Sequence, residues 1–287
     1  MIELSIIIPH HNTPALLQRC LASIPVSDSI QVIVVDDNSD PQKVDFDAFP
    51  GKDREGVEVY LTKEGKGAGY ARNVGLQHAQ GEWLLFADSD DFFVPGFYDV
   101  VARYFKSDLT MVMFKANSVD SETLAPSNRN ENINRQIDAC LAGKITPKEA
   151  SIAVQSPWCR LIHRAFVERE EIRFDEIMAC NDAMFTTKAT CRAASVDVCA
   201  EPIYVVTYRE GSLWNSRKTN PRNYLLRLRV QIRRNKYVRP YGFPQLPIMG
   251  LVVKSLEISL PTFLKALWIA LSKGALLQGI SYYIRKR

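Results

Sequence analysis

One stretch of the chain reads Trp83-Leu84-Leu85-Phe86-Ala87-Asp88-Ser89-Asp90-Asp91. Its apolar first half has the length and composition of a buried strand. Its second half places three carboxylates within four positions, which a packed core cannot accommodate. Carboxylates at the carboxyl end of a parallel strand lie where open α/β sheets bind ligands, and Mg²⁺ and Mn²⁺ prefer oxygen ligands of this kind. The stretch therefore indicates a metal or phosphate site, although a solvated acidic turn before a helix would show the same pattern.

Three other apolar runs precede this stretch and also have the character of buried strands. They lie at residues 4–9, 31–35 and 57–61. The second run also ends in acids, here Asp36 and Asp37. Helical spacing of apolar residues after Pro14, and a helix start in the glycine-rich segment 65–76, place helices between the runs. This alternation over about the first 110 residues predicts an α/β fold, with a mostly parallel sheet covered by helices on both faces.

The glycine-rich segment 65–76 offers backbone amides at the start of a helix, where a phosphate can bind, and Arg72 adds positive charge. It does not match a dinucleotide fingerprint, because Arg72 stands where a third small residue is needed, and no Gly-Lys-Ser/Thr of a P-loop follows. Arg72 could equally pair with an acid on the helix face. At one sheet edge, this segment and the two carboxylate clusters would form a single nucleotide-sized site.

The second half of the chain shows a less regular pattern. Residues 109–114 indicate another strand, and the polar, asparagine-rich residues 117–136 indicate a loop or flexible lid. A helix should begin near Asn181 or Asp182. Two more strands are expected, at residues 196–200 and 203–208.

The net charge of +4 conceals a strong asymmetry. Residues 211–287 contain 15 Lys and Arg but one acid, Glu257, whereas residues 1–210 contain 21 bases and 31 acids. A basic extension on an acidic body indicates an anionic partner surface, either nucleic acid or the inner leaflet of a membrane. We expect no nucleic-acid partner, because the body is acidic and the extension contains no recognisable nucleic-acid-binding module.

Two apolar runs in the basic extension lie at residues 246–253 and 263–271. Lys254, Lys265 and Lys273 interrupt every window long enough to span a bilayer, so we expect no transmembrane helix. On a helical wheel, Lys254 and Lys265 are about 20° apart at 100° per residue, which favours helices that lie in a membrane interface and are divided at Pro261. The same helices could instead complete a core or form a homodimer contact.

The first residues of the sequence lack the basic start, apolar middle and cleavage site of a signal peptide. We therefore expect a cytoplasmic protein that associates peripherally with the cytoplasmic face of the membrane through its extension. The six cysteines show no metal-ligand spacing and are expected to be free thiols, so no zinc site is predicted.

Five motifs, in order along the chain, resemble those of the family-2 glycosyltransferases, which are inverting, nucleotide-sugar-dependent enzymes of the GT-A fold. The motifs are Ser5-Ile6-Ile7-Ile8-Pro9 with Asn12, Val35-Asp36-Asp37-Asn38-Ser39, Gly69 to Gly75 with Arg72-Asn73, Asp88-Ser89-Asp90-Asp91, and Asn181-Asp182. The resemblance covers about the first 210 residues. It implies a Rossmann-like, mostly parallel central sheet with flanking helices, in which residues 1–115 bind the nucleotide sugar and residues 116–210 form the acceptor side. Residues 211–287 would add the basic amphipathic helical extension.

The resemblance also implies which residues bind the nucleotide of the donor. Pro9 and Asn12 would line the pocket. Asp37 would accept a hydrogen bond from the base, by analogy a uracil, while Asp36 supports the loop. Arg72 would approach the base or the diphosphate.

By the same resemblance, the acidic stretch would bind the sugar and a metal. Asp88 and Ser89 would lie on the ribose and sugar side of the donor. Asp90, as in a DXD motif, would hold a Mn²⁺ or Mg²⁺ ion that bridges the diphosphate oxygens. Asp91 is held in reserve as a further ligand.

On the acceptor side, the resemblance implies that Asp182 is the general base that deprotonates the acceptor hydroxyl. A role as a helix N-cap would fit the neighbours of Asp182 equally well. Trp158 and Arg160 resemble an acceptor-side pattern of polysaccharide-making members, although Trp158 could equally be a core residue. Asn181 belongs to the same side, as does Arg209, whose charge could stabilise the leaving group.

The resemblance thus predicts an enzyme, a hexosyltransferase-type glycosyltransferase. It would move a sugar from a nucleotide diphosphate donor, a UDP-sugar, to a glycan or lipid-linked acceptor in cell-surface polysaccharide synthesis. The alternative is a catalytically silent nucleotide-sugar-binding scaffold in a polysaccharide-assembly complex. The presence of Asp37, Asp90 and Asp182 together favours the enzyme, because a silent homologue has no chemical need to keep them.

Overall fold

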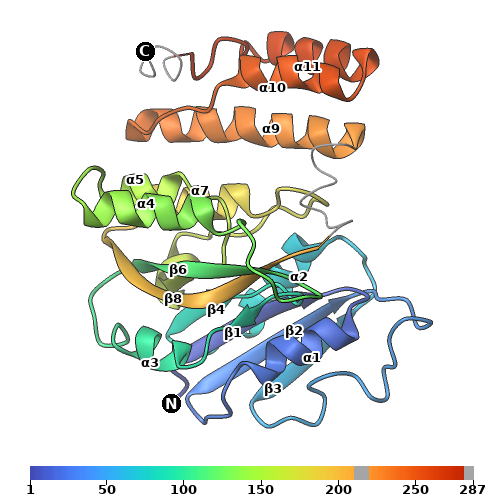
Figure 1. Ribbon diagram of the computed structural model, residues 1–287, viewed down its shortest axis with the longest axis vertical. Helices are drawn as coiled ribbons and strands as arrows, with labels where there is room; N and C mark the ends of the chain where they lie inside the picture. Colours follow the sequence, from blue (N-terminus) through green and yellow to red (C-terminus); the bar gives the residue numbers. More distant parts are fainter. Residues whose placement is uncertain (210–219, 281–287) are drawn as a thin grey trace.

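In the computed structural model, which describes residues 1–209 and 220–280, eight strands form a single sheet with helices on both faces (Figure 1). The strands lie in the order β3-β2-β1-β4-β7-β6-β8-β5. Four of the seven neighbouring pairs are parallel and three are antiparallel. The predicted α/β fold with a mostly parallel, Rossmann-like sheet is therefore confirmed, with a larger antiparallel part than the sequence indicated.

The first four strands form the parallel half of the sheet and match the predicted apolar runs. They are β1 (Leu4–His10), β2 (Ile30–Asp37), β3 (Val57–Thr62) and β4 (Trp83–Phe86). Every residue of β1, β2 and β4 is buried, as expected for strands that are covered on both faces. Alternate residues of β1 enter different cores, with Ile6 and Ile8 in one and Ile7 in the other.

Helices complete these two cores on opposite faces of the sheet. The core that contains Ile6 includes residues of α1 (Pro14–Ala22), α3 (Phe97–Ala102), α4 (Glu131–Leu141) and α5 (Pro147–Ile152). The core that contains Ile7 includes residues of α2 (Ala68–His78), α6 (Arg164–Arg169) and α7 (Ala183–Arg192). Because both faces of the sheet are covered, a ligand has access at the carboxyl ends of the strands.

The other half of the sheet differs from the sequence prediction. It contains β5 (Phe92–Phe93), β6 (Met111–Asp120), β7 (Arg160–His163) and β8 (Val196–Tyr208). β7 lies between β4 and β6 and runs antiparallel to both. β8 is one long strand where two were predicted, because its pairing with β6 shifts register around Lys115 and then continues.

The loop or lid predicted at residues 117–136 is confirmed only in its middle, at residues 121–130, and is wrong at both ends. β6 continues to Asp120, and α4 begins at Glu131. Asparagines that suggested a loop instead bond the backbone of β6 at Ala116. Asn130 and Asn134 donate to its carbonyl oxygen, and Oδ1 of Asn134 accepts from its N–H. These side chains pair with the hydrogen-bonding groups of a strand backbone. A prediction from composition instead counts asparagines as turn residues.

The helical extension forms a separate layer beyond α4, α5 and α7 (Figure 1). It contains α9 (Pro221–Val238), η1 (Arg239–Tyr241), α10 (Ile248–Lys254), η2 (Ser255–Glu257) and α11 (Leu260–Ser272). α9 contacts α7 on one side and both α10 and α11 on the other. Leu228, Val252 and Ile269 belong to a core of its own. Pro261 lies in the first turn of α11, where the division was expected.

The prediction that Lys254 and Lys265 lie on the same side of a helical wheel is wrong, because the two lysines lie on different helices. The predicted domain boundary after residue 210 falls outside the described residues. Within residues 1–209 and 220–280, no helix combines the length and the apolar character that crossing a bilayer requires.

Gly75 lies where α2 closely approaches β1. A β-carbon at this position would overlap Cγ2 of Ile7. Alanine is favoured over glycine inside a helix by about 1 kcal/mol. We nevertheless expect Gly75→Ala to lower the free energy of unfolding by about 1 to 3 kcal/mol, because it overpacks the core. Urea denaturation measures the difference.

Gln77→Ala, at an exposed position of the same helix, is the matched control. It should leave the free energy of unfolding almost unchanged. A Gly75→Ala variant as stable as the wild type would show that Ile7 can move aside.

Candidate active site

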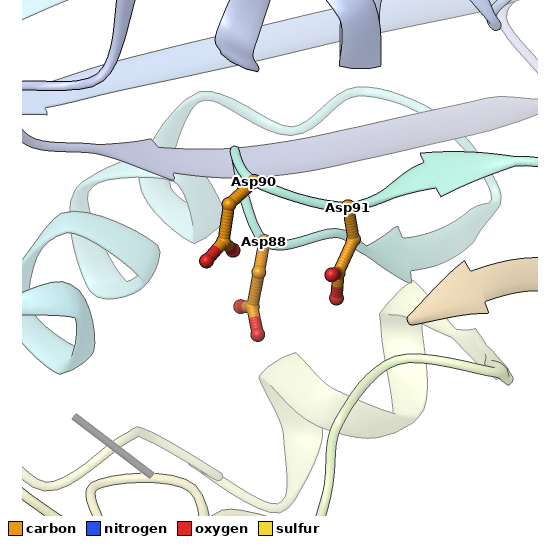
Figure 2. Close-up of side chains that lie close together, drawn as sticks. All are labelled: Asp88, Asp90 and Asp91. Atoms are coloured by element: carbon orange, nitrogen blue, oxygen red, sulfur yellow. The ribbon is translucent and has the colours of Figure 1, made fainter. Parts of the chain in front are cut away.

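The acidic stretch leaves β4 at the carboxyl edge of the parallel half of the sheet. The side chains of Asp88, Asp90 and Asp91 reach into one space (Figure 2), and their ligand oxygens all lie within 4.8 Å of one another. Asp88 and Asp90 are partly exposed, whereas Asp91 is buried. The three aspartates therefore form a cluster and not a solvated turn.

This acidic cluster has the chemistry of a divalent-cation site. Burial raises the pKa of Asp91 well above its ordinary range and also raises the pKa of Asp90. The charges of neighbouring carboxylates add to both shifts. Oδ1 of Asp91 accepts hydrogen bonds from the N–H and the hydroxyl of Thr207, but Oδ2 has no hydrogen-bond partner among the described residues. A cation would satisfy this oxygen and remove the repulsion, so these residues fit Mn²⁺ or Mg²⁺. Asp91, held in reserve above, belongs to the cluster as closely as Asp90.

Elements distant in the sequence hold the backbone of the acidic cluster. The N–H of Asp88 donates to the hydroxyl oxygen of Tyr204 at 2.8 Å. The carbonyl of Asp90 accepts from the hydroxyl of Thr207 at 2.9 Å and from Arg19 at 2.7 Å. Sequence reasoning missed Tyr204, Thr207 and Arg19, because they lie in ordinary strand and helix patterns of β8 and α1 and form no motif.

Arg72 lies buried between the acidic cluster and the loop before α7. Its guanidinium pairs with Oδ1 of Asp88, donates to Oδ1 of Asn181 at 3.0 Å, and lies 5.3 Å from the ring centroid of Phe174. Arg72 therefore pairs with an acid, as the alternative interpretation held, but the acid comes from the cluster and not from its own helix. Arg72 is only 4% exposed, which makes it a brace across the site and not an open ligand for a base.

Gly69 permits the close contact between α2 and this loop. A β-carbon on residue 69 would overlap the carbonyl oxygen of Asp175 and lie 2.9 Å from Cβ of Asn181. Further toward the N-terminus of the segment, the amides of Lys66 and Gly67 donate to Asp37 at 3.2 and 2.6 Å. The amides predicted to receive a phosphate therefore bind the carboxylate of Asp37 instead.

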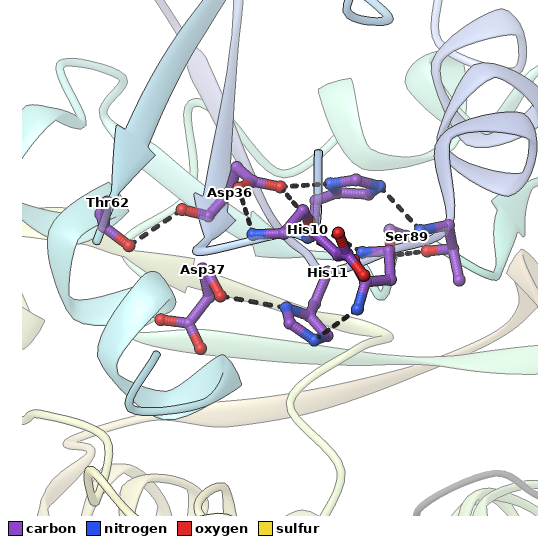
Figure 3. Close-up of polar contacts among 10 residues, drawn as sticks. His10, His11, Asp36, Asp37, Thr62 and Ser89 are labelled. Carbon is purple, nitrogen blue, oxygen red and sulfur yellow. Dashed lines mark hydrogen bonds and ion pairs between the residues drawn. The ribbon is translucent and has the colours of Figure 1, made fainter. Parts of the chain in front are cut away.

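A hydrogen-bonded network joins the loops after β1 and β2 (Figure 3). Asp36 is 1% exposed and accepts from Nδ1 of His10 at 2.7 Å, and from the N–H and hydroxyl of Ser39 at 2.9 and 2.5 Å. Nε2 of His10 accepts from the N–H of Thr13, which assigns the imidazole proton to Nδ1. Asp36 thus supports this loop, as expected.

Other residues predicted to bind the nucleotide lie in the same region. Asn12 adopts a φ of 58°, which asparagine tolerates, and its Oδ1 accepts from the N–H of Asp40 at 2.8 Å. Ser89 lies 3.4 Å from the hydroxyl of Thr13, so the loop after β1 meets the acidic stretch. Pro9 is buried within β1. The structure brings these residues to one edge of the sheet.

Asp182 directly precedes α7 and adjoins the Arg72 brace through Asn181. It is partly exposed and occupies the N-cap position of α7, as the alternative held, but its side chain makes no capping hydrogen bond there. Burial lowers the pKa of Arg160 to about 10, and the charges of Cys159 and Asp182 oppose that shift. Asp182 is thus a partly exposed carboxylate directly after Asn181, and a carboxylate can accept a proton.

The predicted contact of Arg160 with an acceptor is wrong. Its side chain has no exposed surface, and its guanidinium donates to three main-chain carbonyl groups within residues 151–156 at 2.6 to 3.0 Å. Trp158 is also a core residue, as the alternative held, because it is 6% exposed and stacks on Tyr204 with ring centroids 5.6 Å apart. The acceptor side therefore retains Asn181 and Asp182 from the predicted set.

Arg209 lies beside the acidic cluster. Its Nη2 is 3.7 Å from Oδ2 of Asp90, and its side chain is 40% exposed. A partly exposed cation beside the acidic cluster can meet an anionic ligand.

Comparisons with known proteins point to one family. The family model described as glycosyl transferase family 2 matches residues 5–169. The chain is 26% identical over 212 residues to the putative glycosyltransferase EpsH of Bacillus subtilis. It is also 26% identical over 232 residues to the poly(ribitol-phosphate) beta-N-acetylglucosaminyltransferase TarS of Staphylococcus aureus.

The crystal structure of S. aureus TarS 1–349 in complex with UDP-GlcNAc matches with a TM-score of 0.60 at 21% identity, over 92% of this chain and 69% of that one. This likeness shows a common fold. The sequence matches cover 70% and 78% of the chain but only 59% of EpsH and 39% of TarS. The chain therefore corresponds to a part of these relatives.

Asp36 should stabilise the fold at neutral pH and lose this effect in acid. Burial alone would raise its pKa, but hydrogen bonds from His10 and Ser39 outweigh burial and hold the pKa below its ordinary value of about 4. The stabilisation is therefore present above about pH 4 and is lost as the pH falls through the folded-state pKa. We expect Asp36→Asn to lower the free energy of unfolding by about 1 to 3 kcal/mol at neutral pH, as measured by urea denaturation.

Asp53→Asn, at an exposed position, is the control and should change the free energy of unfolding by less than about 0.5 kcal/mol. The deficit of Asp36→Asn should shrink as the pH is lowered. A deficit that persisted undiminished well below pH 4 would rule out the carboxylate charge as its cause.

Proposed function

Because the chain belongs to glycosyl transferase family 2, we propose that it is an inverting glycosyltransferase that moves a sugar from a nucleotide diphosphate donor to an acceptor hydroxyl. One observation carries this proposal. The acidic cluster is joined through the Arg72 brace to the Asn181-Asp182 pair, so a cation site and a candidate base share one edge of the sheet. Donor activation and acceptor deprotonation need these two groups at neighbouring positions.

The proposed donor is a UDP-sugar, and the proposed acceptor is a glycan or lipid-linked glycan in cell-surface polysaccharide synthesis. The TarS structure with a similar fold is a complex with UDP-GlcNAc. TarS and a relative from Bacillus spizizenii, 25% identical over 239 residues, both carry poly(ribitol-phosphate) in their names. These names support a polymeric acceptor.

In the proposed donor site, Asp90 would hold a Mn²⁺ or Mg²⁺ ion together with Asp88 and Asp91. Such an ion supplies positive charge that stabilises a diphosphate leaving group. Arg209, beside Asp90, would donate to the departing phosphate.

The nucleotide would bind against the loops after β1 and β2. Asp37 would accept from the base with lone pairs that Lys66 and Gly67 leave available, since a carboxylate has about four acceptor sites. Asn12 and Ser89 would border the pocket, and Pro9 would form part of the strand beneath it. The support of this loop by buried Asp36 favours a preformed pocket.

In the proposed reaction, the carboxylate of Asp182 takes the proton of the acceptor hydroxyl while that oxygen attacks the anomeric carbon. The bond from this carbon to the diphosphate breaks on the opposite face, so the configuration inverts. A single displacement needs no carboxylate nucleophile. Asn181, held by Arg72, would fix the start of α7 and with it the position of Asp182.

Donor binding tests the proposal first. The purified chain with Mn²⁺ and a panel of nucleotide sugars should melt at a higher temperature with its donor, because a ligand that binds only the folded state stabilises it. Asp90→Asn should abolish the Mn²⁺-dependent shift and the Mn²⁺-dependent release of nucleoside diphosphate.

Asp99→Asn, at an exposed position of α3, should retain both properties. Wild-type turnover by Asp90→Asn with Mn²⁺ would contradict the metal role of Asp90. Donor binding by the wild type without any release of nucleoside diphosphate would favour the silent scaffold over the enzyme.

Asp182→Asn should separate binding from turnover. The general base acts in the transfer step, so we expect unchanged donor affinity by calorimetry and a fall in turnover of at least about a hundredfold. Lost donor binding would instead give Asp182 a structural role, and unchanged turnover would exclude it as the base.

A further inference from the structure

α11 exposes four large apolar side chains on one side and buries a side that consists mostly of small residues. Leu260, Leu264, Trp268 and Leu271 are 61%, 56%, 68% and 57% exposed. They follow one another at intervals of four, four and three residues, so they lie on one side of the helix, which we call the outer face. The opposite side, which meets α9 and α10, contains Thr262, Ala266, Ile269 and Ala270. α11 thus has an exposed apolar face in addition to its buried one, and an apolar helix face normally packs against a partner.

The neighbouring segments along the chain also expose large apolar side chains. Met249, Val253 and Leu256 of α10 and η2 are exposed at helical spacing, and Leu277 is 64% exposed. Nine of the sixteen large apolar side chains that are exposed in the described residues lie between positions 249 and 280. Isolated exposed leucines are ordinary, but a concentration of this kind marks an interaction surface.

The charge around the outer face identifies its partner. Residues 220–280 contain ten Lys and Arg and one acid, Glu257. Lys254, Lys265 and Lys273, which flank the apolar side chains along the chain, are all exposed. A second copy of the chain docked on the same surface would bring like charges together, because a two-fold contact pairs a patch with itself. An anionic lipid surface instead offers phosphates for the lysines and an acyl region for the leucines.

The surface is fixed to the body of the protein. Asn235 of α9 is fully buried and bonds both the N–H and the carbonyl of Leu246, the segment that leads into α10, at 2.8 and 2.7 Å. The hydroxyl of Tyr224 donates to the carbonyl of Leu251 in α10 at 2.6 Å. On its other side α9 contacts α7, and its Gln231 exchanges hydrogen bonds with Gln155, in the segment between α5 and β7. Binding at the outer face would therefore orient the whole molecule.

We propose that the outer face of α11, with the adjoining side of α10, lies in the headgroup region of an anionic bilayer. α11 has 13 residues and is about 20 Å long, which is too short to cross the hydrocarbon core. It lies along the surface, with Leu260, Leu264 and Leu271 toward the acyl chains. Trp268 occupies the boundary that tryptophan prefers, and the lysines reach the lipid phosphates.

Vesicle flotation of the full chain tests this proposal without any need for donor or acceptor. The wild type should float with phosphatidylcholine vesicles that contain phosphatidylglycerol, and less with pure phosphatidylcholine. Leu264→Asp/Trp268→Asp should lower the partition coefficient at least about tenfold, because it removes two apolar anchors and adds negative charge. Added salt should weaken wild-type binding by screening the lysines.

Val26→Asp/Leu124→Asp is the matched control, since these side chains are 58% and 55% exposed on the body. It should float like the wild type, and both double variants should keep the wild-type melting temperature because the replaced side chains are mostly exposed. Flotation of Leu264→Asp/Trp268→Asp equal to the wild type, or no flotation of the wild type with anionic vesicles, would overturn the proposal. A wild-type dimer in sedimentation velocity that becomes a monomer in this variant, without vesicle binding, would identify the outer face as a subunit contact instead.

Discussion

The buried guanidinium of Arg72 connects the two sides of the site. It pairs with Asp88 at the end of β4 and with Asn181 before α7, and the missing side chain of Gly69 lets the loop come close enough for this contact. A guanidinium with its planar array of donors can bind two acceptors in fixed directions, which a lysine ammonium cannot do. The removal of either partner would leave a buried charge with fewer hydrogen bonds, so the three residues constrain one another. The geometry of the acidic cluster and the placement of Asp182 thus depend on one side chain.

The parallel half of the sheet could be predicted because each strand has its own apolar run that ends in a polar turn. The antiparallel half could not. β7 pairs with β4 and β6 although it is only four residues long, and no local pattern states which strands a short segment joins. Asn130 and Asn134 misled the prediction because composition cannot distinguish an asparagine in a loop from one that satisfies a strand backbone. Tertiary contacts decide both cases.

The charged residues of the site show the same limit of prediction from sequence, because tertiary contacts decide their roles. Arg160 and Arg209 are the same residue type, and sequence reasoning gave both to the acceptor side. The structure buries Arg160 among main-chain carbonyl groups and places Arg209, partly exposed, beside Asp90. The aspartates were easier to predict, because three carboxylates in four positions cannot be buried without a reason. The structure shows that all three lie in one cluster, and Oδ2 of Asp91 has no hydrogen-bond partner among the described residues.

Because α11 packs on α9 and α9 packs on α7, the helical layers set the distance between α11 and α7. Packed helix axes lie about 8 to 10 Å apart, so two such steps separate α11 from α7 by about 20 Å. With the outer face of α11 in the headgroups, the start of α7 would stand at about this height above the lipid. An acceptor hydroxyl would then have to extend about this far from the lipid to meet Asp182. The thickness of the helical layers would thus set the height of the site above the membrane.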